Sequence, residues 1–103
     1  MFIVVYCTVP KDEAKTLAEK IIYAKLAACV NIVDEVNSVY FWQGNIEQNE
    51  ESLLIIKSKQ SVFEKLANFI TRNHPYDVPE IIAMPIVNAN LDYLNWLDES
   101  VEE

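Results

Sequence analysis

The order of apolar segments predicts an α+β fold, β-α-β-β-α-β, followed by a C-terminal helix. Four apolar, β-branched runs predict strands, at residues 2–8, 27–42, 46–59 and 81–87. Between the first and second runs, and again between the third and fourth, apolar residues recur at spacings of three and four. This spacing is typical of a helix with one buried stripe. The only glycine, Gly44, stands between the second and third runs and predicts a hairpin turn.

The first run, Phe2 to Thr8, is continuously apolar and is therefore expected to be covered on both faces or nearly so. Pro10 suits the first turn of the next helix, and Asp12 and Glu13 suit the positive end of its dipole. The helical stripe that follows is expected to end near Lys25. It consists of Ala14, Leu17, Ala18, Ile21 and Ile22.

Residues 27–42 are interpreted as one long, bulged strand, and residues 46–59 as a second strand that pairs with it in antiparallel fashion. An arm of about 14 residues at ~3.3 Å each reaches on the order of 45 Å, whereas the radius of gyration of a domain of this size is about 13 Å. The tip is expected to project and to be covered by further copies of the chain in a closed homo-oligomer. The alternative is a hairpin that bends back into the local core. The tip residues are Tyr40, Phe41, Trp42 and Ile46.

In the second half, Ser61 and Glu64 predict a capping box, and Pro75 is expected to end that helix after His74. Pro85 places the last strand at a sheet edge, and Asn90 is expected to cap the terminal helix.

Together these elements predict the split-βαβ, ferredoxin-like plan, with the strand order four, one, three, two. Cys7 and Cys29 then lie on strands that are not neighbours, which argues against a disulfide between them.

The composition predicts a single domain spanning residues 1–103, with 51% hydrophobic residues and a net charge of −8. That charge disfavours nucleic acid as a partner, and no apolar stretch has the ~20 residues that cross a bilayer. The residues after Met1 do not form a signal peptide, so we expect a cytoplasmic protein without membrane insertion. The sequence contains neither a glycine-rich phosphate loop nor a nucleophilic triad signature.

Cys7 and His74 are the candidate metal ligands, because a thiolate and an imidazole together suit copper or zinc. The alternatives are a cysteine that is simply a small buried hydrophobe, and a histidine that bonds a carbonyl at a helix end. Two ligands are fewer than the four of a closed site.

A binding cleft is the second candidate site. Pro75 and Pro79 stiffen the segment between helix and strand and hold the side chains between them in set directions. Lys57, in the otherwise apolar third strand, needs solvent or a carboxylate, and Glu51 and Glu80 are candidate partners. The alternative is a purely structural role, as an ion pair that fixes register or as a subunit contact. The cleft candidates are Trp42, Glu51, Lys57, Tyr76 and Glu80.

The chain resembles the CutA family of divalent-cation tolerance proteins through six stretches in the same order. They are residues 7–10 (CTVP), 25–31 (KLAACVN), 40–44 (YFWQG), 51–57 (ESLLIIK), 74–80 (HPYDVPE) and 93–97 (YLNWL). The resemblance implies a ferredoxin-like protomer in a PII-like homotrimer, a role in copper and divalent-cation tolerance, and metal ligands at Cys7 and His74. The chain departs from the family at Asn73, where some relatives carry a second histidine, and an amide is a poorer copper ligand.

These observations lead us to expect a non-enzymatic cytoplasmic homotrimer that binds copper or other divalent cations weakly in metal homeostasis. A second hypothesis is a small-molecule sensor that binds a metabolite at clefts between subunits. A third is an assembly scaffold for a membrane or enzyme partner.

Overall fold

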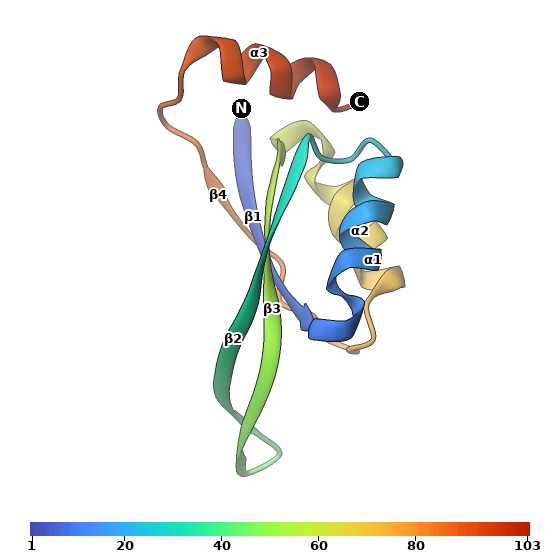
Figure 1. The fold of residues 1–103 in the computed structure, drawn as a ribbon, viewed down its shortest axis with the longest axis vertical. Helices are drawn as coiled ribbons and strands as arrows, with labels where there is room; N and C mark the ends of the chain where they lie inside the picture. The colour runs from blue at the N-terminus through green and yellow to red at the C-terminus, as the bar shows by residue number, and fades with distance from the viewer.

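A four-stranded antiparallel sheet in the order β2-β3-β1-β4 organises the structure, which is a computed structural model describing residues 1–103. This arrangement confirms both the ferredoxin-like plan and the predicted strand order. The helices α1 and α2 lie side by side on one face of the sheet, while α3 crosses one end of it (Figure 1). The elements are β1 (Phe2–Pro10), α1 (Ala14–Tyr23), β2 (Cys29–Trp42), β3 (Asn45–Lys59), α2 (Phe63–Asn73), β4 (Ile82–Pro85) and α3 (Leu91–Ser100).

The core lies between the sheet and the two helices. Alternate residues of β1, namely Ile3, Val5, Cys7 and Val9, are buried, and the residues between them are only partly buried. The prediction that β1 is covered on both faces or nearly so is met on one face only within a single chain, where α1 and α2 cover it and the residues of the other face stay partly buried. The opposite face carries three cross-strand rows, which are Met84–Val4–Lys57–Cys29, Ile82–Tyr6–Ile55–Asn31 and Thr8–Leu53–Val33.

The hairpin of β2 and β3 extends beyond the helices, and the molecule is 45 Å long but only 22 to 25 Å across (Figure 1). Gln43 and Gly44 form its turn with positive φ angles of 52° and 85°, as a two-residue type I′ turn requires. Phe41 is 72% exposed and Ile46 is 64% exposed. The tip therefore projects, as the sequence predicts, and does not fold back into the core.

The predicted bulge is present in β2. Val33 pairs with Leu53 and Val36 pairs with Glu51, so two residues, Asp34 and Glu35, oppose the single residue Ser52. The hydroxyl of Ser52 donates a hydrogen bond to the Asp34 carbonyl oxygen over 3.1 Å and holds the bulge in place.

Helix termini differ from the prediction. The Ser61–Glu64 capping box is wrong, because a 3-10 turn over Gln60–Val62 precedes α2 and the Ser61 hydroxyl donates to the Glu103 carboxylate instead. Asn90 does stand at the N-cap of α3, but only its backbone carbonyl is used, accepting from the amide of Leu94. The first helix ends at Tyr23, and the chain turns at Lys25, whose φ is 58°.

The C-terminal helix α3 is tied to β3 by Lys59, which is almost fully buried. Its ammonium group lies 3.0 Å from Oδ1 of Asp98 and 3.6 Å from Oε1 of Glu103. The Ser61 hydrogen bond and the Lys59 charge lower the pKa of Glu103. Beneath the ion pair, Val62, Leu97 and Val101 form a second apolar cluster. None of the α-helices has the length and apolar character that a membrane-spanning helix needs.

Candidate functional site

The structure brings Cys7 and His74 to one backbone carbonyl, that of Thr8. The imidazole Nε2 of His74 lies 2.8 Å from the Thr8 oxygen, and the Cys7 thiol lies 3.6 Å from the same oxygen. Because a carbonyl only accepts, Nε2 carries the proton, and the neutral ring uses Nδ1 to accept from the Tyr76 amide at 3.1 Å. Both ring nitrogens are therefore occupied by backbone partners.

This geometry does not suit a metal at Cys7 and His74. A metal-binding imidazole needs a free nitrogen lone pair, and a metal-binding cysteine needs its thiolate. Burial, with the nearby Glu80 and Glu51 carboxylates, raises the pKa of the Cys7 thiol to about 12, so the thiol stays protonated at neutral pH. No group of three or more His, Cys, Asp or Glu side chains is arranged to hold a metal ion. The arrangement matches the alternative in which the histidine secures a carbonyl at a helix end.

Cys29 lies on β2, separated from the β1 residue Cys7 by β3. Both cysteines are free. The expectation that they form no disulfide with each other is confirmed.

A pocket of about 670 Å³ opens beside Thr8, at the base of the hairpin. We call it the acidic–aromatic pocket, because it contains three aromatic rings and four carboxylates and no Lys, Arg or His. It is lined by Thr8, Ser38, Val39, Tyr40, Trp42, Glu47, Glu51, Tyr76, Asp77, Val78 and Glu80.

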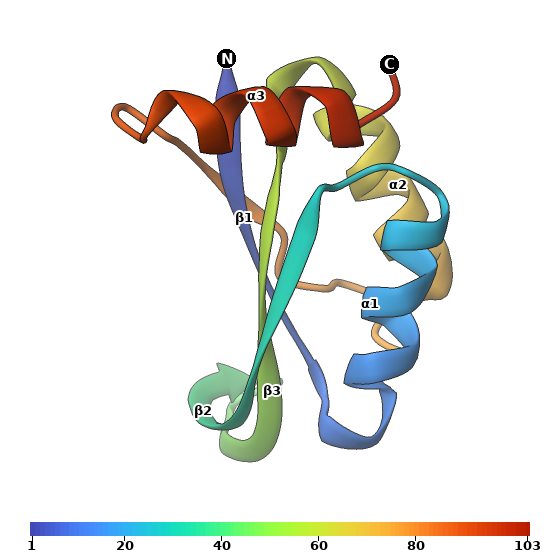
Figure 2. The same cartoon turned by 45° about the horizontal axis from the view of Figure 1, so that its top comes forward.

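The bulge in β2 determines which hairpin side chains face this pocket. Directly paired residues share a face of a sheet, so Ser38, Tyr40 and Trp42 lie on the same face as their partners Asn49, Glu47 and Asn45, and as Glu51. Without the extra residue in β2, Val39 and Phe41 would occupy that face instead. The hairpin also curls at its far end (Figure 2). The bulge therefore gives the pocket its Tyr40 and Trp42 rings.

Glu51 lies at the bottom of the pocket and is only 3% exposed. The Tyr76 hydroxyl donates a hydrogen bond of 2.8 Å to its Oε2 atom. Burial and this bond to the carboxylate raise the pKa of Tyr76 well above the ordinary phenol value. Tyr76 therefore stays protonated and keeps its donor directed at Glu51.

Two further contacts fix the aromatic side chains. The rings of His74 and Tyr76 lie 4.8 Å apart, so the histidine that secures Thr8 also supports Tyr76. In the hairpin, the Asn49 amide donates to the Tyr40 hydroxyl. The loop after α2 and the hairpin thus each present a held aromatic ring to the pocket.

Four of the five predicted cleft residues, Trp42, Glu51, Tyr76 and Glu80, line this pocket. Lys57 does not: it lies on the same face of β3 as Glu51 but further along the strand, between Val4 and Cys29. It forms no ion pair within the chain, so neither of the candidate partners Glu51 and Glu80 pairs with it there. Six residues along one strand separate Lys57 from Glu51 by about 20 Å.

The predicted cleft set missed seven lining residues, which are Thr8, Ser38, Val39, Tyr40, Glu47, Asp77 and Val78. The only available signal is the alternation of Ser38, Tyr40 and Trp42, and it becomes informative only once the position of the bulge is known.

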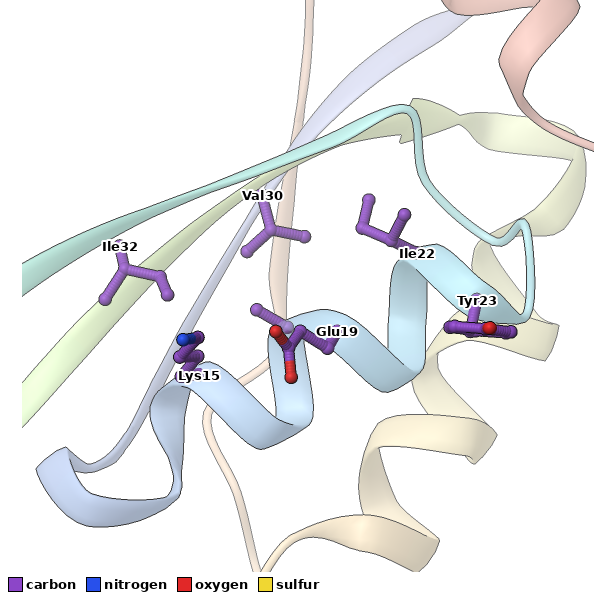
Figure 3. Close-up of a pocket in the computed structure, with 7 residues that line it drawn as sticks. Lys15, Glu19, Ile22, Tyr23, Val30 and Ile32 are labelled. Atoms are coloured by element: carbon purple, nitrogen blue, oxygen red, sulfur yellow. The ribbon is translucent and has the colours of Figure 1, made fainter.

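A second, mainly apolar depression of about 560 Å³ lies between α1 and β2. Figure 3 shows Val30 and Ile32 pointing from β2 toward α1, with Lys15 and Glu19 along the helix. Five of its seven lining residues are hydrophobic, and it lacks the convergent polar groups of the acidic–aromatic pocket.

The fold and the pocket define a small ferredoxin-like domain with a long projecting hairpin and an acidic pocket at its base. The family model described as CutA1 divalent ion tolerance protein matches residues 3–100. The chain therefore belongs to the CutA1 family, which confirms the resemblance seen in the sequence.

Curated relatives agree. The chain is 46% identical to the divalent-cation tolerance protein CutA of Thermus thermophilus over 98 residues, covering 94% of this chain and 95% of that protein. It is 54% identical over 102 residues to the chloroplastic CutA 1 of Oryza sativa, covering 98% of this chain and 58% of that protein. The chain thus spans little more than half the length of the rice relative, and 54% of the Arabidopsis thaliana one.

Solved structures share the whole fold. The crystal structure of CutA1 from Oryza sativa superposes with a TM-score of 0.97 at 52% identity, covering 99% of this chain and 94% of that chain. The Thermus thermophilus structure gives a TM-score of 0.95 at 44% identity, covering 99% of this chain and all of that chain.

Proposed function

We propose that the chain is a non-enzymatic binding protein of divalent-cation tolerance that works as a homotrimer and binds copper or other divalent ions weakly. Family membership supports the general role. The proposal that it is not an enzyme rests on the Cys7–His74 pair. A protonated, buried thiol beside an imidazole with both nitrogens engaged is not an activated nucleophile.

The surface that α1 and α2 leave uncovered supports the homotrimer. The helix-free face of the sheet includes Ile82 and Met84, which are exposed, and the hairpin tip adds the paired residues Phe41 and Ile46. Apolar surface of this kind on a long strand pair typically marks a contact with another chain. A closed ring of copies covers it without leaving a free end.

The proposed metal binding is weak because no preassembled ligand set exists. A net charge of −8 attracts divalent cations, but attraction to exposed carboxylates is screened by salt. The affinity for Cu²⁺ and Zn²⁺ should therefore fall as ionic strength rises, and it should not depend on Cys7 or His74.

Sedimentation tests the homotrimer, and calorimetry tests the metal binding separately. Sedimentation at micromolar concentration should give about 36 kDa, three times the 11.9 kDa of one chain. A stable, folded 11.9 kDa species would contradict the trimer. Titration of Cu²⁺ should give equal, salt-sensitive affinities for the wild type and a folded Cys7→Ser, His74→Gln double variant. Tight, salt-independent binding that the double variant loses would show that these two residues are ligands.

The cytoplasmic location stays a prediction, and the names of two plant relatives carry the word chloroplastic. A fluorescent fusion of the chain, imaged against organelle markers in its native cell, should show diffuse cytoplasmic signal. Enclosure within an organelle would contradict it.

A second candidate function is small-molecule sensing, and the acidic–aromatic pocket favours it. A concave site with a few convergent polar groups is the usual form of a ligand pocket. A ligand that raises the melting temperature without added metal would support this candidate, whereas a response to metal ions alone would contradict it.

A further inference from the structure

We infer that the acidic–aromatic pocket binds an organic ammonium ion, with the Glu51 carboxylate as its buried charge partner. The inference rests on the second candidate function above and names the chemistry of its ligand.

Glu51 is a buried charge without a countercharge. It is 3% exposed, and none of the ion pairs in the structure includes it. Removing a carboxylate from water is costly unless it is paired and fully hydrogen-bonded. The Tyr76 hydroxyl satisfies only Oε2, so the pairing is incomplete.

The second oxygen of Glu51 is available to a ligand. Oε1 accepts no hydrogen bond from any side chain or backbone amide, since Tyr76 makes the only hydrogen bond to this carboxylate. No fully enclosed side-chain nitrogen or oxygen lacks a partner, so Oε1 must be open to the pocket that Glu51 lines. A donor entering the pocket would complete its hydrogen bonding.

The rest of the lining selects a cation. Glu47, Asp77 and Glu80 add three carboxylates, and no Lys, Arg or His is present to receive an anion. Tyr40, Trp42 and Tyr76 supply aromatic faces, which attract ammonium groups through their π electrons. The pocket therefore combines charge with rings, as alkylammonium recognition requires.

Size distinguishes an organic cation from a metal ion. The pocket volume of about 670 Å³ falls within the range of about 300–1,000 Å³ of small-molecule sites. Its carboxylates are not clustered tightly enough to form a metal site, and its rings offer no metal ligand other than phenol oxygens. An aliphatic amine can span separate carboxylates and lie against the rings at the same time.

Matched ligands test the ammonium requirement. Calorimetry should show saturable binding of 1,4-diaminobutane, a primary ammonium compound, or of choline, a quaternary one. Whichever binds more tightly shows which type of ammonium group the pocket accepts. The neutral 1,4-butanediol and the anionic succinate should not bind. In a Trp96→Phe background, binding should change the fluorescence of Trp42, which is then the only tryptophan. Equal affinity for the diol and the diamine, or no saturable binding of either ammonium compound, overturns the inference.

Matched variants test the role of Glu51. Glu51→Gln keeps the shape and the acceptor for Tyr76 but removes the charge, and it should weaken binding at least tenfold. Glu64→Gln removes one charge on α2, outside the pocket, and should leave affinity unchanged. If Glu51→Gln does not fold, Glu80→Gln, at an exposed position of the lining, should weaken binding more than Glu64→Gln does. Equal effects of pocket and control variants overturn the inference.

These outcomes separate the inference from the functions it builds on. Succinate or butanediol binding in the pocket would overturn the ammonium inference and leave small-molecule sensing standing. The trimer and the salt-sensitive metal binding are measured independently of both.

Discussion

The Nε2–H group of His74 donates to the carbonyl oxygen of Thr8, joining the end of α2 to the end of strand β1 across 66 positions of sequence. The same ring accepts from the Tyr76 amide and contacts the Tyr76 ring. One imidazole thus fixes both the strand end and the aromatic residue that bonds Glu51.

Replacing His74 should therefore affect stability first. His74→Ala leaves the partly buried Thr8 carbonyl with only the weak Cys7 thiol as a side-chain donor and should lower the free energy of unfolding by about 1–3 kcal/mol. Urea denaturation measures this loss. Asn73→Ala is the control, because the Asn73 side chain bonds only the Phe69 carbonyl within its own helix. Equal destabilisation by the two changes would contradict the bridging role.

The raised pKa of Cys7, about 12, predicts a loss of stability at alkaline pH. Above the ordinary thiol pKa of about 8.5, the unfolded chain loses this proton while the folded chain keeps it, so unfolding becomes more favourable. The slope is at most about 1.4 kcal/mol per pH unit, and the contribution is fully present below pH 8.5 and lost by about pH 12.

Urea denaturation between pH 8 and 11 on wild type and Cys7→Ala measures this effect. The variant should show a shallower decline, although Tyr76, whose pKa is also raised, still contributes. Parallel curves would contradict the raised pKa of Cys7.

The ion pair between Lys59 and Asp98 should hold α3 against the sheet. Asp98→Ala removes a 3.0 Å partner of an almost fully buried ammonium group, and we expect a cost of about 1–3 kcal/mol. Hydrogen exchange should accelerate in α3 before the rest of the chain. Glu99→Ala, one residue along the same helix and without a partner, should leave α3 protected.

Ser52 should stabilise the bulge that orients Tyr40 and Trp42. Ser52→Ala removes its hydrogen bond to Asp34 and should cost about 0.5–1.5 kcal/mol, with faster amide exchange around residues 34–36. Ser38→Ala removes a hydroxyl that forms no hydrogen bond within the chain and should have a smaller effect. An unchanged exchange rate at the bulge in Ser52→Ala would show that pairing alone maintains it.

The elements that sequence predicts well are those that local periodicity determines. The stripe of α1, the apolar run of β1 and the Gln43-Gly44 turn each carry their own signal, and the strand order follows from the rules for crossover connections. The projecting tip follows from strand length alone.

The errors arise where distant residues compete. Ser61 has the composition of a cap, but Glu103, 42 positions away, takes its hydroxyl. The neighbours of His74 and the burial of Glu51 likewise depend on residues far along the chain.

The central position of β1 has a consequence for synthesis. Its partners are residues 51–59 on one side and 82–85 on the other, so the first strand made by the ribosome is among the last to be fully paired. Until β4 emerges, the apolar segment Phe2–Pro10 lacks one of its two neighbours. Folding of the nascent chain therefore waits for long-range closure and should be slower than for a helical domain of equal length.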